Sequence, residues 1–197
     1  MEFPLDNAMI VPILISFGKY EPGSGKTTDA KYIADNHAGE ITSYSTGELI
    51  LQEIESGSVL GQIEKGYVEK GDLIPTSMVL DTIFSAIKRS PTDVVILDGF
   101  PRKEKQLTEF CDVVFGSKEL EVISVIEVRV GEETAKNRYL ARGGKEEVFS
   151  HAMEAYTNSI KDIEDRYADK GLLTVIDGEQ KLDKVVEDIE AHLRSLL

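Results

Sequence analysis

The most chemically specific part of the sequence is a glycine-rich segment that continues into a lysine and two threonines. Its residues are Gly23, Ser24, Gly25, Lys26, Thr27 and Thr28. Glycine lets the main chain turn its N–H groups toward a phosphate, and a helix that begins there adds partial positive charge. In such a loop Lys26 would reach the β- and γ-phosphates of a nucleotide, and the Thr27 hydroxyl would coordinate Mg²⁺. The spacing therefore predicts a binding loop for a nucleoside triphosphate.

The first half of this segment departs from the usual phosphate-loop pattern. That pattern has a glycine five positions before Gly25, where this chain has Tyr20, and the nearest candidate, Gly18, lies two residues too early. Two interpretations stay open: Lys19 and Tyr20 are an insertion, or Tyr20 replaces a glycine. In a plainer alternative, the segment is only a glycine-rich helix start.

Asp98 is the second candidate for chemistry, because it ends the apolar run 94–97. A carboxylate at the carboxyl end of a strand can hold a water of a Mg²⁺ shell. Aspartate also follows strands simply because it favours turns. Combined with the glycine-rich segment, however, Asp98 favours a nucleotide site with bound magnesium.

Short apolar runs that alternate with helical stretches would position these residues. The expected strands are Ile10 to Phe17, Glu40 to Tyr44, Asp93 to Leu97, Val122 to Val128 and Leu172 to Ile176. Glycine or proline lies near their ends, as is usual where strands end. This alternation predicts an α/β fold of three layers, with a five-stranded parallel sheet between two layers of helices.

Periodic apolar residues predict two long helices near the end of the chain. One stripe is formed by Phe149, Met153, Tyr156, Ile160, Ile163 and Tyr167. The other is formed by Leu182, Val185, Val186, Ile189, Leu193 and Leu196, and its one-sided pattern predicts a helix lying on the sheet. We interpret both stripes as core.

Glycines are expected to divide the stretch after the second strand into short helices. They are Gly57, between two serines, and the glycines at 61, 66 and 71, after which Pro75 is placed to start a new helix. Residues 142–147 are expected to be a very short connection between two helices. The whole chain, residues 1–197, is expected to form one domain.

The overall charge and the cysteine content limit the function classes. The 22 basic and 36 acidic side chains give a net charge of −14, which argues against broad contact with nucleic acid or an anionic membrane. Cys111 is the only cysteine, so a reducing compartment is expected. The apolar run near the N-terminus contains Pro12 and follows acidic residues, unlike a signal peptide or membrane span. We expect a cytoplasmic monomer.

Further segments resemble adenylate kinase motifs in order and spacing. They are Ser45–Leu49, Lys70–Pro75, and Asp98–Arg102 with Gln106. Arg138 and Arg142 resemble the residues beside that family's lid, and Val175–Gly178 resembles its last strand and adenine-side loop. The similarity spans about residues 9 to 197. It implies a P-loop kinase fold with an AMP-binding segment at about 45–75 and a truncated lid at about 142–147.

The resemblance also implies a reaction and a role for each matched residue. The reaction is reversible phosphoryl transfer from Mg-ATP to AMP, giving two ADP. The implied AMP-binding residues are Thr46, Ile74, Gly99, Arg102 and Gln106. The implied ATP-binding residues are Gly23 to Thr28, Arg138, Arg142 and the Gly178 carbonyl. Lys26, Arg102, Arg138 and Arg142 would be catalytic, and Thr27 and Asp98 would hold Mg²⁺, the latter through water.

Three positive charges of the family pattern are missing from this chain. Leu51 and Ala152 stand where the family carries arginines, and an Arg-x-Asp-Asp segment of the lid is absent. Because a hydrogen bond to a charged group contributes about 1.5 to 3 kcal/mol, their loss would slow turnover by roughly a thousandfold or more. One alternative is a degenerate or engineered nucleotide-binding protein with little or no kinase activity. Another, disfavoured by Thr46, is a kinase for a pyrimidine or other nucleotide.

Overall fold

The fold is described here from a computed structural model of the chain. The described residues are 8–14, 26–70, 72, 74–101, 103–117, 119–141, 143–147, 149, 161 and 163–196. For residues 8–14 and 26–29 this description covers the main chain only. These ranges include all five predicted strand regions in whole or in part.

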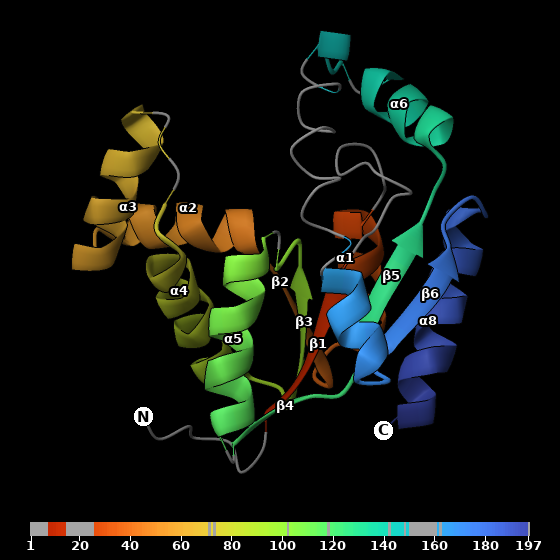
Figure 1. The fold of residues 1–197 in the computed structure, drawn as a ribbon, viewed down its shortest axis with the longest axis horizontal. Helices are drawn as coiled ribbons and strands as arrows, with labels where there is room; N and C mark the ends of the chain where they lie inside the picture. Colours follow the sequence, from red (N-terminus) through yellow and green to blue (C-terminus); the bar gives the residue numbers. More distant parts are fainter. Residues whose placement is uncertain are drawn as a thin grey trace.

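A parallel sheet forms the centre of the molecule (Figure 1). Its strands, in spatial order, are β2 (Ile41–Ser45), β3 (Val94–Asp98), β1 (Ala8–Leu14), β5 (Val125–Arg129) and β6 (Leu173–Asp177). A short strand, β4 (Leu120–Val122), pairs with the first residues of β1. The predicted five-stranded parallel sheet is therefore confirmed, with β4 as an addition.

The prediction of one strand over 122–128 was wrong. The chain leaves the ladder at Ile123 and Ser124, so that β4 pairs with β1 at Ala8–Ile10 and β5 pairs with it at Ile13–Leu14. The Ser124 hydroxyl lies 2.7 Å from Nε2 of His192, away from the strand ladder. An apolar run contains no signal for such a break in pairing. The first strand also begins earlier than predicted, at Ala8, and the predicted end at Phe17 lies outside the described residues.

Helices cover both faces of the sheet. They are α1 (Lys26–Asn36), α2 (Thr46–Ser56), α3 (Val59–Lys70), α4 (Thr76–Lys88), α5 (Glu104–Gly116), α6 (Glu132–Ala141) and α8 (Leu182–Leu196). Residues 163–169 are also helical. In β3, Val95 and Leu97 pack into the core cluster that contains α4, α5 and Tyr167, whereas Val94 and Ile96 pack into the cluster that contains α1 and α8. A strand whose alternate side chains enter two cores is the middle layer of three.

Helices α2 and α3 project beside the sheet and form a separate lobe (Figure 1). Gly57, with a φ of 71°, ends α2, as predicted. Gly61 and Gly66 were expected to break the chain, but both lie within α3. At Gly61 the reason is packing, because a Cβ there would lie 2.0 Å from the main-chain oxygen of Glu53. This glycine lets the two helices touch, so it does not act as a helix breaker.

The predicted closing helix is confirmed as α8, with Val185, Val186, Ile189 and Leu193 buried. Leu182 and Leu196, at its two ends, are more than a third exposed, so the buried stripe is shorter than predicted. In the other stripe Phe149, Ile163 and Tyr167 are buried, and Met153, Tyr156 and Ile160 lie outside the described residues. Within the described part of the chain, none of the helices combines the length and apolar character needed to cross a bilayer.

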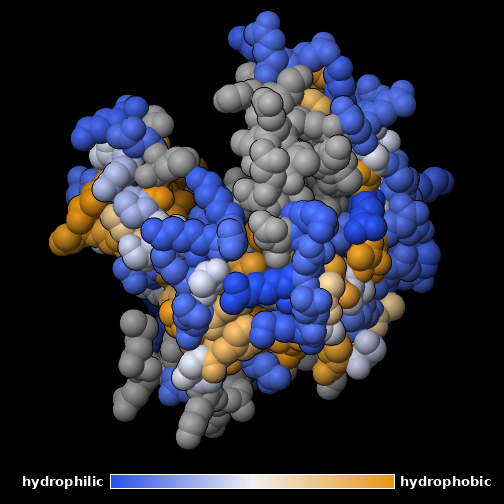
Figure 2. Space-filling view, viewed as in Figure 1, coloured by the Kyte–Doolittle hydropathy of each residue, from blue (hydrophilic) through white to orange (hydrophobic). Residues whose placement is uncertain are grey.

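The surface is mainly hydrophilic on the side shown in Figure 2. Apolar side chains gather at the outer flank of the α2–α3 lobe (Figure 2). In α3, Val59 and Ile63 are exposed and lie one turn apart. The lobe thus has a polar tip and an apolar flank.

Candidate functional site

The carboxyl ends of four parallel strands meet at one edge of the sheet. Asp98 of β3 lies opposite Ile13 of β1 on one side and opposite Ser45 of β2 on the other. Leu14 of β1 lies opposite Glu127 of β5. In open α/β sheets, ligands bind in the crevice outside this edge. The edge therefore defines where the predicted site should lie.

The predicted phosphate loop leads from this edge into the first helix. Lys26, Thr27 and Thr28 form the first turn of α1, which follows β1 in the chain. Gly23, Ser24 and Gly25 lie outside the described residues. The order of strand and helix agrees with the predicted strand, loop and helix.

Asp98 and Thr46 lie together at the strand edge. Asp98 is the last residue of β3 and only 2% exposed, and Thr46 is the buried first residue of α2. The Thr46 hydroxyl donates a hydrogen bond to the main-chain oxygen of Asp98 at 3.3 Å. A residue predicted for AMP binding and one predicted for magnesium are thereby brought into contact.

The chain after Asp98 is shaped by a glycine and anchored by an aromatic pair. Gly99 has a φ of 71°, a conformation that side chains disfavour. Phe100 is buried and packs edge-on against Phe110 of α5, with ring centroids 5.2 Å apart. Arg102 lies outside the described residues, whereas Gln106 is half-buried in the first turn of α5.

Ile74 lies just before α4, on the lobe side of the site. It is half-buried and packs against the core cluster that contains α4 and α5. Ile74 and Thr46 therefore lie at the starts of two helices of the same segment, α4 and α2.

On the other side of the edge, the structure brings Arg138 and Gly178 together. The Arg138 Nη2 atom of α6 donates a hydrogen bond to the Gly178 carbonyl oxygen at 3.2 Å. Gly178 follows β6, and its N–H donates to the main-chain oxygen of Arg129 at 2.7 Å. A Cβ at position 178 would lie 2.6 Å from a methyl carbon of Val130, so the close packing requires glycine. Arg142 lies outside the described residues.

An ion pair between a buried glutamate and a half-exposed arginine, at the same edge, was missed by the sequence analysis. Glu127 of β5 is fully buried and accepts a hydrogen bond from Nε of Arg129 at 2.5 Å. This hydrogen bond is the main reason that the pKa of Arg129 is raised. The sequence signal was an acidic residue inside an otherwise apolar strand, Val125–Arg129. The two charges of the pair offset each other, so it adds no net charge to the edge.

The carboxyl groups of Glu64, in the α2–α3 lobe, and of Glu179, beside Gly178, have shifted pKa values. Burial raises the pKa of Glu64, which lies inside the packing of α3 against α4. A main-chain hydrogen bond from Gly131 lowers the pKa of Glu179, with the Thr134 hydroxyl as a second cause. Among the described residues, no three histidine, cysteine or acidic side chains cluster as metal ligands usually do.

This arrangement defines a class of protein. An open parallel sheet with helices on both faces, and a helix start and a buried carboxylate at its carboxyl edge, is the architecture of the mononucleotide-binding α/β proteins.

Comparison with known proteins assigns the family within that class. The family model for adenylate kinase matches residues 19–172. The adenylate kinase of Sulfurovum sp. is 45% identical over 185 residues, covering 88% of this chain and 94% of that protein. The adenylate kinase of Nautilia profundicola is 43% identical over 177 residues, covering 88% and 92%. That of Campylobacter jejuni (strain RM1221) is 43% identical over 179 residues, covering 89% and 93%.

The chain belongs to the adenylate kinase family. It therefore has the P-loop kinase fold of that family, and it is a nucleoside monophosphate kinase, a phosphotransferase.

Proposed function

We propose that this chain transfers the γ-phosphoryl group of Mg-ATP to AMP, reversibly, giving two molecules of ADP. The observation that carries the proposal is the sheet edge at Asp98, where the start of the AMP-side helix α2 and the end of β1 meet. Phosphoryl transfer needs two nucleotides held with their phosphates close together. The contact between Thr46 and Asp98 and the contact between Arg138 and Gly178 lie at two separate parts of that edge. We assign the first part to AMP and the second to ATP.

The ATP side consists of the phosphate loop, α6 and the loop after β6. We infer that Gly23, Ser24, Gly25 and the first turn of α1, Lys26 to Thr28, wrap the phosphates of ATP with main-chain N–H groups. Arg138, Arg142 and the Gly178 carbonyl complete the ATP side. Lys26 bridges the β- and γ-phosphates.

The AMP side consists of the α2–α4 segment and the start of α5. We infer that Thr46 and Ile74 lie on either side of the adenine of AMP. We also infer that Gln106 recognises the adenine by hydrogen bonds to the edge of the ring. Arg102, after Gly99, binds the AMP phosphate, since the planar fork of a guanidinium matches a phosphate.

Magnesium fits the residues at the centre of the edge. The Asp98 carboxyl group is buried there, and hard oxygen ligands are those that Mg²⁺ prefers. We infer that Asp98, through water, and the Thr27 hydroxyl hold the ion. When bound, Mg²⁺ neutralises negative charge on the β- and γ-phosphates.

The chain's own residues act by positioning and by charge. An oxygen of the AMP phosphate forms a bond to the γ-phosphorus of ATP while the bond from that phosphorus to the bridging oxygen breaks. The electron pair of the broken bond stays on the β-phosphate of the leaving ADP. Lys26, Arg102, Arg138 and Arg142 stabilise the charge that develops, and no covalent enzyme intermediate is needed.

We further propose that turnover is reduced by the missing positive charges. Leu51, which stands where the family pattern has an arginine, is 55% exposed and contributes no charge to a phosphate. In this proposal residues 1–197 form one domain, with an AMP-binding segment at about 45–75 and a truncated lid at about 142–147. We propose a cytoplasmic monomer that binds neither nucleic acid nor membrane.

The test is ADP formation from ATP and AMP, measured by a coupled assay with Mg²⁺ and with a chelator. Lys26→Ala should abolish activity, and so should removal of Mg²⁺. Lys31→Ala is the matched control, because it removes an exposed lysine from the same helix, α1, and should change nothing.

A rate for the unsubstituted chain equal to that of Lys26→Ala would refute the proposal. It would favour the degenerate nucleotide-binding protein instead. A parallel panel of AMP, CMP, UMP and GMP tests the choice of acceptor, and a preference for a pyrimidine nucleotide would contradict the proposed AMP site.

A further inference from the structure

Glu179, the residue after Gly178, forms hydrogen bonds with the beginning of α6. One carboxyl oxygen of Glu179, Oε1, accepts a hydrogen bond from the N–H of Gly131, and the other, Oε2, accepts one from the Thr134 hydroxyl at 2.7 Å. Gly131 directly precedes α6, and Thr134 lies in its first turn. Both oxygens of one carboxylate are therefore bonded to the start of a helix that lies more than 40 residues earlier in the chain.

This contact suits the chemistry of a helix start. The first N–H groups of a helix have no partner within the helix, and its N-terminus carries partial positive charge. A carboxylate satisfies both needs. The pKa of Glu179 is lowered, first by the Gly131 hydrogen bond and then by the Thr134 hydroxyl, which agrees with a site that favours the ionised carboxylate.

The same loop contacts α6 again one turn further along. Thr134 and Arg138 are four residues apart and so lie on one face of the helix. Thr134 binds Glu179 and Arg138 binds the carbonyl of Gly178. Two neighbouring residues of the loop thus hold two successive turns of α6.

The loop itself is firmly held. Its Gly178 N–H binds the main-chain oxygen of Arg129, and the N–H of Glu179 binds Oδ1 of Asp177 at 2.9 Å. There is no room for a Cβ at Gly178. Because the loop is anchored to the ends of β5 and β6, it can serve as a fixed base for α6.

We propose that Glu179 is a positioning residue of the ATP side, which fixes α6 so that Arg138 lies beside the Gly178 carbonyl. This proposal rests on the proposed function for the statement that Arg138 and Gly178 face ATP. Helix α6 and the α2–α3 lobe lie on opposite sides of the molecule (Figure 1). The position of Arg138 should therefore affect ATP and leave AMP unaffected.

The test compares variants that break single contacts. Thr134→Val keeps the side-chain shape but removes the hydroxyl, and Glu179→Gln keeps one acceptor oxygen in place of two. Each should lower kcat/KM for ATP about three- to tenfold, the effect of one lost hydrogen bond, through a higher KM for ATP, a lower kcat or both, because Arg138 is also proposed to stabilise the developing charge. KM for AMP should stay unchanged. Thr134→Ser keeps the hydroxyl and should retain the original KM.

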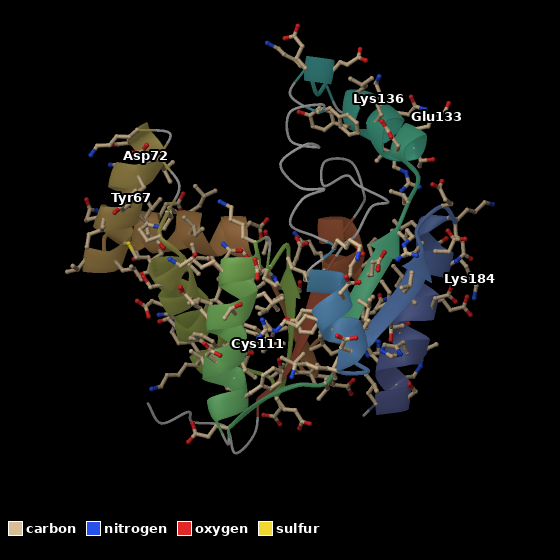
Figure 3. All side chains as sticks on the ribbon, in the orientation of Figure 1. Tyr67, Asp72, Cys111, Glu133, Lys136 and Lys184 are labelled. Atoms are coloured by element: carbon tan, nitrogen blue, oxygen red, sulfur yellow. The ribbon has the colours of Figure 1, made fainter. Side chains whose placement is uncertain are left out.

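Glu133→Ala is the matched control. It removes a carboxylate from the same turn of α6, and Glu133 lies on the outer side of that helix (Figure 3). This variant should leave both KM values unchanged. Thermal unfolding is recorded for every variant, so that a loss of stability is seen separately from a change in KM.

Lower thermal stability with an unchanged kcat/KM for ATP would overturn the proposal, since Glu179 would then only stabilise the fold. An equal rise in KM for AMP would overturn it as well. ATP binding measured by calorimetry without AMP separates the two proposals. If the chain binds ATP but forms no ADP, the proposed reaction fails, while weaker ATP binding by Thr134→Val would still support the role of Glu179. If the chain binds no ATP, both proposals fail.

Discussion

The hydroxyl group of Thr46 donates a hydrogen bond to the main-chain oxygen of Asp98, and this bond joins the first residue of α2 to the last residue of β3. Both residues are buried, so the bond is shielded from water. The start of the proposed AMP-binding segment is thereby tied to the strand that ends in the proposed magnesium residue. A change at Thr46 should therefore affect AMP before it affects ATP.

Thr46→Val removes this hydroxyl while it keeps the shape of the side chain. We expect KM for AMP to rise about three- to tenfold, because one hydrogen bond contributes about 0.5 to 1.5 kcal/mol, and KM for ATP to stay the same. Steady-state kinetics with each substrate varied in turn checks this. Thr46→Ser should behave like the unsubstituted chain. An equal rise for ATP would contradict the assignment of Thr46 to the AMP side.

Leu51→Arg restores a positive charge on the AMP side. Because Leu51 is half exposed on α2, the longer side chain should be accommodated without a large loss of stability. We expect kcat/KM for AMP to rise at least about tenfold, since a hydrogen bond to a charged group contributes about 1.5 to 3 kcal/mol. Leu51→Gln, which is polar but uncharged, is the control. If both variants give the same rate, the missing charge does not limit turnover.

Gly61 and Gly66 should respond oppositely to alanine, although both lie in α3. A Cβ at Gly61 would lie 2.0 Å from the main-chain oxygen of Glu53. Main-chain atoms cannot move aside as easily as the end of a flexible side chain. Gly61→Ala should therefore lower the free energy of unfolding by about 1 to 3 kcal/mol. At Gly66 no atom of the described residues lies within 4 Å of the added Cβ, so Gly66→Ala should raise it by about 0.5 to 1 kcal/mol. Urea unfolding measures both, and changes of the same sign would disprove the packing argument.

Glu64 should make stability depend on pH. It is fully buried and accepts a hydrogen bond from the Thr82 hydroxyl at 2.8 Å. Burial raises its pKa, and the nearby Glu53 raises it further. Because the folded chain holds this proton more tightly than the unfolded chain, the stability it contributes is present at low pH. That contribution is lost as the pH rises from the unfolded pKa through the folded pKa.

Glu64→Gln removes this titration. We expect the variant to be more stable than the unsubstituted chain at pH 7, where the charged carboxylate is penalised, and the difference to shrink toward pH 4. Urea unfolding at a series of pH values measures the difference. Glu55→Gln, on the exposed side of neighbouring α2, controls for a general charge effect. A difference that does not vary with pH would show that Glu64 titrates alike in both states.

Local patterns in the sequence were sufficient to predict the main elements. Apolar runs separated by helical stretches predicted the parallel sheet, and the one-sided stripe predicted α8 from Leu182 to Leu196. These predictions succeeded because each depends on neighbours a few residues apart, which the sequence displays directly. The motif around Asp98 likewise predicted that a strand would end there, and β3 does end at that residue.

The contacts between distant segments were decided only by the tertiary structure. The break between β4 and β5 depends on which part of β1 each strand pairs with. Gly61 lies within α3 because α2 packs against it, and nothing in its local sequence distinguishes it from a helix breaker. The bonds from Gly131 and Thr134 to Glu179 join residues 48 and 45 positions apart. The spacing of residues along a chain determines its local conformation, but the folding of the whole chain determines which side chains meet across such separations.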